Sequence, residues 1–155
     1  MKACVVGIGN VLMSDEGVGV RVAEKLVEVV KSEKLENVEV YDGGNLNFQL
    51  LEYMSNSDLA IFVDAIDFDG RAGEVRVFDI SDVEGAEFFT IHDLDYTKII
   101  GIAKMCGIDI PEKIFVVGIK PEIVKEGLEL SDSVKNSLDE AVNKVLDIIK
   151  KFQES

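Results

Sequence analysis

The chain has 155 residues, 47% of them hydrophobic and 30% charged, which predicts a single globular domain over residues 1–155 with a core of its own. Its formal net charge of −14 argues against nucleic acids and anionic membranes as partners, because both require a basic face. The sequence contains no run of 18 apolar residues, so it predicts no membrane-spanning helix. The apolar N-terminus lacks the cleavage site of a signal peptide, so we do not expect one. We therefore expect a cytoplasmic monomer. Cys4 and Cys106 lie in apolar contexts without Cys-x-x-Cys spacing, so both are predicted to be buried free thiols.

Apolar runs alternate with helical patterns along the chain, which is typical of an α/β fold. Strands are predicted at Lys2–Ile8, Val38–Asp42 and Leu59–Val63. The last of these is apolar throughout, as expected for a central strand that is covered on both faces. Helices are predicted at Asp15–Lys31 and Leu46–Met54 from the spacing of their apolar residues.

The second half of the chain continues the pattern. A strand at Glu74–Phe78 follows after a connection too short for a crossover helix, so it should be antiparallel to its neighbour or lie at an edge. The remaining elements are a helix, a strand and a long C-terminal helix capped by Ser131 or Ser133, predicted at Asp95–Cys106, Ile114–Ile119 and Val134–Ile149. The predicted fold class is α/β: a three-layer sandwich with a mixed, mostly parallel sheet of about five strands and helices on both faces.

Residues 5–20 read Val-Val-Gly-Ile-Gly-Asn-Val-Leu-Met-Ser-Asp-Glu-Gly-Val-Gly-Val and begin like a nucleotide-binding loop. However, the third glycine of a dinucleotide fingerprint would fall at Leu12, and Asp15 and Glu16 occupy the helix N-terminus that a phosphate would need. Two carboxylates repel a pyrophosphate and favour a cation. We expect Asp15 to cap the helix, a role that asparagine fills equally well.

Three candidate ligands map to the carboxyl ends of the strands, where the binding crevice of such a sheet lies. Glu16 follows the first strand, Asp64 ends the third, and His92, the one histidine of the chain, lies in a loop before a helix. Two carboxylates and an imidazole suit zinc, nickel or manganese with positions open for water or substrate. Each residue also has a purely structural explanation, since acids in a first helical turn complement its dipole and loop histidines are often structural.

Other hydrolytic chemistries lack their signatures. There is no His-Glu-x-x-His and no Gly-x-Ser-x-Gly, although Ser14 near His92 stays open as a nucleophile. Cys106 has no evident activating neighbour.

The glycine and acidic motifs together resemble those of the nickel–iron hydrogenase maturation endopeptidases. The opening motif is Gly7-Ile-Gly9-Asn10 with Asp15-Glu16-Gly17. Four more motifs follow in order over nearly the whole chain: Asp42-Gly43-Gly44; Asp64-Ala65 with Gly70 and Gly73; His92 with Gly107-Ile-Asp-Ile-Pro111; and Gly118-Ile-Lys-Pro121-Glu122 with Gly127-Leu-Glu-Leu-Ser131. The chain departs from the pattern at three positions, Asn45, Leu46 and Ala72, where the family commonly has a threonine, a small residue and a proline. The particular hydrogenase therefore stays open.

The resemblance implies a cytoplasmic protease that removes the C-terminal extension of the hydrogenase large-subunit precursor after nickel insertion. It implies a metal site at Glu16, Asp64 and His92, with nickel supplied by the substrate and zinc or another divalent ion as a surrogate. The predicted catalytic set is these three residues and Asp42, a candidate base or orienting residue that equally fits a turn before Gly43. Two alternatives remain: a non-proteolytic nickel-delivery or checkpoint chaperone for the same subunit, and a flavodoxin-like cofactor-binding module.

Overall fold

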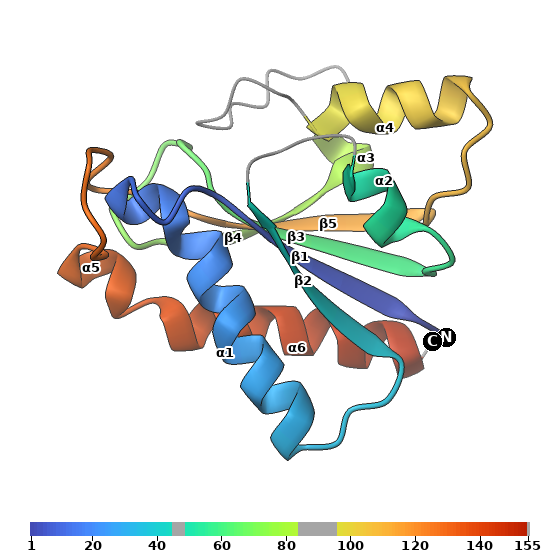
Figure 1. Cartoon of the computed structure of the whole chain (residues 1–155), viewed down its shortest axis with the longest axis horizontal. Helices are drawn as coiled ribbons and strands as arrows, with labels where there is room; N and C mark the ends of the chain where they lie inside the picture. Colours follow the sequence, from blue (N-terminus) through green and yellow to red (C-terminus); the bar gives the residue numbers. More distant parts are fainter. Residues whose placement is uncertain (45–48, 84–95, 155) are drawn as a thin grey trace.

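The sheet at the centre of the molecule positions the candidate residues Glu16, Asp42 and Asp64. The computed structural model describes residues 1–44, 49–83 and 96–154, and within them the sheet has the strand order β2-β1-β3-β5-β4 (Figure 1). The first four strands in this order are parallel, and β4 is antiparallel to β5. The strand bounds are β1 Ala3–Ile8, β2 Val38–Gly44, β3 Leu59–Ala65, β4 Val75–Asp79 and β5 Lys113–Ile119. The predicted fold class is confirmed, and the short connection does lead to an antiparallel edge strand.

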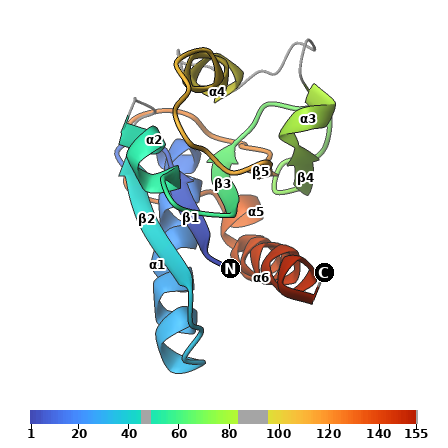
Figure 2. The ribbon, with the colours of Figure 1, turned by 90° about the vertical axis from the view of Figure 1, so that its right-hand side faces the viewer.

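Helices cover both faces of the sheet, which gives the three layers visible in Figure 2. Helices α1 and α6 lie on one face, whereas α2 and α4 lie on the other (Figure 1). The helix bounds are α1 Val18–Ser32, α2 Gln49–Met54, α3 Ile80–Val83, α4 Tyr96–Met105, α5 Asp132–Lys135 and α6 Leu138–Glu154. In the part of the chain that the structure describes, no helix has the length and apolar character needed to cross a membrane.

The alternation of side chains along the strands supplies the two cores. In β1, Val5 faces the layer of α1 and α6, whereas Cys4 and Val6 face the layer of α2 and α4. All seven residues of β3 are buried, as predicted for a central strand. Burial also raises the pKa of the Cys4 thiol to about 11. Cys106 is exposed just after α4, so the prediction that both thiols are buried is wrong for this one.

Two helical predictions need correction. The first helix begins as one 3₁₀ turn, η1 (Ser14–Gly17), before α1 starts at Val18. The long C-terminal helix is divided into α5 and α6 by a turn at Asn136–Ser137, where the Ser137 N–H donates to the carbonyl of Val134 at 3.0 Å. The Ser137 hydroxyl also donates to the carbonyl of Gly73, so a contact from a distant loop accompanies the break. Ser131 occupies the N-cap position of α5 but makes no side-chain capping bond.

The predicted binding crevice corresponds to the place where the chain changes direction across the sheet. From β1 the chain moves to β2 on one side, then returns to β3 on the other side of β1 (Figure 1). Ligand sites of open α/β sheets lie at such a switch point, outside the carboxyl ends of the strands. Three loops gather at this end, with residues 9–17, 66–74 and 120–131.

Candidate active site

Two glycines hold the first loop tightly against the ends of the strands. Gly9 has φ of +143°, and a Cβ atom there would stand 1.9 Å from the carbonyl oxygen of Glu16. A Cβ atom on Gly19 would stand 2.0 Å from the carbonyl oxygen of Val63 and 2.3 Å from that of Ile8. Only glycine permits these approaches. The backbone of η1 and the first turn of α1 is thereby pressed onto the sheet edge.

This packing brings the segments of Glu16 and Asp64 together. Glu16 lies in η1, which contacts β3, and Asp64 directly follows Val63 in β3. Glu16 is half-buried, whereas Asp64 is fully buried. One carboxylate oxygen of Asp64 accepts the Ala65 N–H at 2.8 Å. Aspartate is seldom fully buried, and this one lies one residue before the end of a central strand at the switch point. The function of both residues stays a prediction.

Asp42 lies one strand further along the same edge. It is exposed near the end of β2, and its Oδ1 accepts the N–H of Gly44 at 2.9 Å. Gly44 has φ of +53°, and its carbonyl accepts the Gly9 N–H at 2.8 Å. Asp42 thus shapes the turn that follows β2, as one of its two sequence interpretations predicts. Its exposure leaves the carboxylate accessible from solvent.

The third predicted ligand, His92, lies outside the described residues. Among the residues that are described, no three His, Cys, Asp or Glu side chains gather closely enough to hold a metal ion. The structure therefore describes the positions of two predicted ligands, Glu16 and Asp64. The convergence of all three ligands stays a prediction.

Asp15 does not cap a helix, contrary to our expectation. Its side chain is fully buried, and neither η1 nor α1 has a side-chain capping bond. The carboxylate instead accepts main-chain N–H bonds from Glu122, Ile123 and Ser131 at 2.8–2.9 Å, and the Ser131 hydroxyl at 2.7 Å. These partners lie 107 to 116 positions away along the chain. No local sequence pattern could have revealed them.

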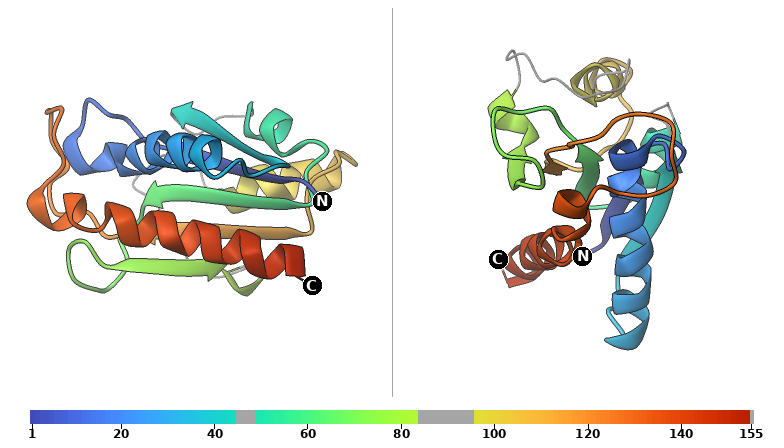
Figure 3. Two further views of the ribbon diagram at one scale, coloured as in Figure 1. Left: turned by 90° about the horizontal axis from the view of Figure 1, so that it is seen from below. Right: turned by 90° about the vertical axis from the view of Figure 1, so that its left-hand side faces the viewer.

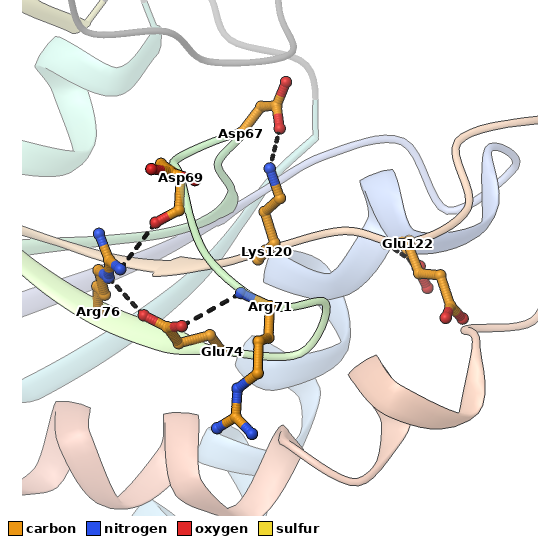
Figure 4. Close-up of polar contacts among 8 residues, drawn as sticks. Asp67, Asp69, Arg71, Glu74, Arg76, Lys120 and Glu122 are labelled. Atoms are coloured by element: carbon orange, nitrogen blue, oxygen red, sulfur yellow. Dashed lines mark hydrogen bonds and ion pairs between the residues drawn. The ribbon is translucent and has the colours of Figure 1, made fainter.

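The loop after β3 is held by a set of charged contacts that sequence reasoning also missed (Figure 4). Lys120, directly after β5, pairs with Asp67 across the crevice edge. The Arg76 guanidinium donates to the Asp69 carbonyl at 2.8 Å and to the Glu74 carboxylate at 2.5 Å. The hydrogen bond from Arg76 lowers the pKa of Glu74. These contacts connect the loops that follow β3 and β5.

Comparison with known proteins identifies the family of the chain. Residues 20–148 match the family model described as hydrogenase maturation protease. The chain is 31% identical over 150 residues to the hydrogenase 2 maturation protease of Escherichia coli strain K12, covering 94% of this chain and 89% of that one. It is 29% identical to the hydrogenase expression/formation protein HupD of Thiocapsa roseopersicina, covering 96% of this chain and 67% of the relative.

Solved structures give the same result. The hydrogenase maturating endopeptidase HybD from E. coli superposes with a TM-score of 0.83 at 28% identity, covering 97% of this chain and 93% of that one. The [NiFe] hydrogenase maturation protease HybD from Thermococcus kodakarensis gives a TM-score of 0.77 at 27% identity, covering 96% and 99% of the two chains. The resemblance noted in the sequence is confirmed: the chain belongs to the hydrogenase maturation protease family.

Proposed function

We propose that this protein is the endopeptidase that removes the C-terminal extension of a nickel–iron hydrogenase large-subunit precursor once nickel has been inserted. The observation that carries the proposal is the position of Glu16 and Asp64. Both lie at the switch point of the sheet, on segments that contact each other. Membership of a protease family supports the hydrolytic part of the proposal.

The donor set favours nickel that arrives with the substrate. The proposed ligands are two carboxylates, Glu16 and Asp64, and the single histidine of the chain, which has two cysteines in all. Cys4 is buried in the first half of β1. Cys106 lies between α4 and the start of β5, and the start of β5 is at the opposite end of the sheet from the carboxyl ends of the parallel strands. Thiolates are therefore not available in the crevice, and a site of two carboxylates and one imidazole should hold a free divalent ion only modestly. A precursor whose cysteines already hold nickel would supply the remaining ligands.

Each proposed residue then has a defined task. Glu16 and Asp64, with His92, would complete the coordination of the precursor's nickel and so align the scissile bond with the crevice. The metal ion supplies Lewis acidity, which polarises a carbonyl or activates a water molecule. Asp42, exposed at the neighbouring strand end, would accept a proton from that water or orient a ligand. Cleavage would depend on metal insertion because the site is incomplete without the substrate.

A folded protein substrate also needs a docking surface, and apolar side chains are exposed on the loop that carries Glu16 and on the segment 121–131 that pairs with it. Leu12, Val124 and Leu128 are 60%, 45% and 66% exposed. They lie on two adjoining segments, because the Gly127 N–H donates to the Leu12 carbonyl at 2.9 Å. Apolar side chains that form a contiguous exposed surface mark interaction sites. We assign them to contact with the precursor.

The test compares two forms of the same precursor. Nickel-loaded and nickel-free large subunit are incubated with the purified protein, and the intact mass of the subunit is measured. The proposal predicts loss of the C-terminal extension from the nickel-loaded form alone. Unchanged mass in both forms would overturn it, and increased nickel content without a change in mass would identify the chaperone instead. Equal cleavage of both forms would contradict recognition of the metal.

A further inference from the structure

Two loops that are distant in sequence pair at the crevice edge (Figure 3). Residues 12–15 lie beside the segment 121–131. The Ser14 N–H donates to the Gly127 carbonyl at 2.9 Å, and the Gly127 N–H donates to the Leu12 carbonyl at the same distance. The segment 121–131 therefore forms a lateral support for the turn that carries Glu16.

The Asp15 carboxylate is the polar centre of this pairing. Its Oδ2 accepts the N–H groups of Glu122 at 2.9 Å and Ile123 at 2.8 Å and the Ser131 hydroxyl at 2.7 Å. Its Oδ1 accepts the Ser131 N–H at 2.8 Å. The side chain is fully buried, and all four donors are neutral. A charged group is buried in this way only where hydrogen bonds compensate for the lost water.

The turn that carries Glu16 is short. It is a single 3₁₀ turn, Ser14–Gly17, in which the Glu16 N–H bonds to the Met13 carbonyl at 3.2 Å. Short 3₁₀ turns have poorer hydrogen-bond geometry than α-helices. The orientation of Glu16 therefore depends on contacts from outside the turn. Gly9 packs against the Glu16 carbonyl, and the preceding residue, Asp15, is held by the segment 121–131.

We propose that Asp15 is a positioning residue for the protease reaction: by binding the segment 121–131, it fixes the direction in which Glu16 is presented to the precursor's nickel. The inference rests on the proposed function of Glu16. Asp15 would not touch the metal, because its two oxygens are occupied by four donors from that segment. It would act as residues that orient metal ligands do elsewhere, where their loss costs about 10- to 100-fold in affinity or activity.

The isosteric change Asp15→Asn tests this directly. An amide has one accepting oxygen and one donating nitrogen, whereas both carboxylate oxygens accept here. In either amide orientation the nitrogen would face at least one main-chain N–H, of Ser131 or of Glu122 and Ile123. The substitution therefore breaks the pairing without altering the size of the side chain.

Position 131 offers a milder pair of variants. Ser131→Ala removes the hydroxyl that donates to Asp15 but keeps the main-chain N–H, whereas Ser131→Thr keeps both donors. We expect Ser131→Ala to weaken function about threefold or more and Ser131→Thr to restore it. Asp139→Asn is the charge-matched control, since its side chain is 90% exposed on α6 and pairs with Lys25 only at 3.8 Å.

The experiment measures binding of Ni²⁺ alone by competition with a chromophoric chelator, and kcat and KM for the nickel-loaded precursor. Both are measured on the full chain at temperatures where circular dichroism shows each variant folded. We expect Asp15→Asn to weaken Ni²⁺ binding and lower kcat/KM by about 10- to 100-fold. In a Glu16→Gln background, Asp15→Asn should lower Ni²⁺ affinity no further, because it acts through Glu16.

Each outcome decides between named possibilities. If folded Asp15→Asn binds nickel and cleaves as the wild type does while Glu16→Gln does not, the positioning role is wrong and the site assignment stands. If Asp15→Asn and Glu16→Gln lower nickel affinity independently, Asp15 does not act through Glu16 and the inference falls. If Glu16→Gln leaves both measurements unchanged, the proposed role of Glu16, on which the inference rests, is overturned, although the protease activity itself stands. Should Asp15→Asn fail to fold, the position 131 variants decide, and wild-type behaviour of Ser131→Ala would refute the inference.

Discussion

Gly19 and Val63 approach so closely that a Cβ atom on Gly19 would stand 2.0 Å from the Val63 carbonyl oxygen. Val63 directly precedes Asp64 on β3, and Gly19 lies three residues after Glu16 at the start of α1. This one contact sets how near the helix terminus comes to the strand end. It therefore helps to hold the segment that carries Glu16 close to the segment that carries Asp64.

We expect Gly19→Ala to be destabilising. The new methyl group would meet main-chain atoms of Val63 and Ile8, which cannot move aside as a flexible side chain can. Overpacking of this kind costs about 1–3 kcal/mol in the free energy of unfolding. Urea denaturation of the purified variant measures the loss. Displacement of α1 should also reduce cleavage of the precursor under conditions where the variant is folded.

The matched control is Gly101→Ala on α4, where a Cβ atom would meet nothing within 4 Å. Alanine is the better helix former by about 1 kcal/mol, so this variant should be as stable as the wild type or more so. Equal stability of the Gly19 and Gly101 variants would show that α1 does not depend on the close contact.

The sequence predicts what depends on local patterns and misses what depends on distant contacts. The apolar run of β3 and the short connection before β4 predict a central strand and an antiparallel edge strand, and both are confirmed. That Glu16 and Asp64 lie at the same edge of the sheet follows from their places after two strands that are predicted to be parallel. The burial of Asp15 does not, because its partners are main-chain N–H groups of a distant loop. The division of the last helix at Ser137, which also contacts Gly73, has the same kind of cause.

The two cysteines should react at very different rates. Cys106 is exposed, whereas Cys4 is buried in β1 and burial raises its pKa to about 11. The thiolate is the reactive form, so Cys4 should resist alkylation in the folded protein even at pH 9. Mass spectrometry after iodoacetamide treatment should show one modification, which is absent in Cys106→Ser. Two rapid modifications in the native state would contradict the burial of Cys4.

The exposed leucine at position 128 should contribute to substrate binding and not to chemistry. Leu128 is 66% exposed, so Leu128→Asp should leave the free energy of unfolding within about 0.5 kcal/mol of the wild type. A charge placed in an apolar contact should raise KM for the precursor severalfold while kcat changes little. Ile102→Asp is the control, because Ile102 is 41% exposed on α4, outside the loops at the crevice. Equal effects of the two changes would exclude the docking role.

Purified protein should contain little tightly held metal. The proposed ligands are two carboxylates and one imidazole, without thiolates, so a free divalent ion should dissociate on mild chelation. Elemental analysis before and after dialysis against a weak chelator measures this. One equivalent of zinc that survives the treatment would instead indicate a conventional metalloprotease with a resident ion.

The most direct test of the account is the intact mass of the nickel-loaded precursor after incubation with Glu16→Gln and His92→Ala variants. Glu16→Gln keeps the size of the side chain and removes a ligand charge, at a cost of about 0.3–1 kcal/mol in helix-dipole energy. His92→Ala removes the single histidine. Asp15→Asn is unsuitable as a control because the Asp15 side chain is buried and hydrogen-bonded. The control is Asp139→Asn, because the Asp139 side chain is exposed. We predict that both site variants fold, as judged by circular dichroism, and leave the precursor at full mass, whereas Asp139→Asn shortens it. Wild-type shortening by Glu16→Gln or His92→Ala would contradict the account.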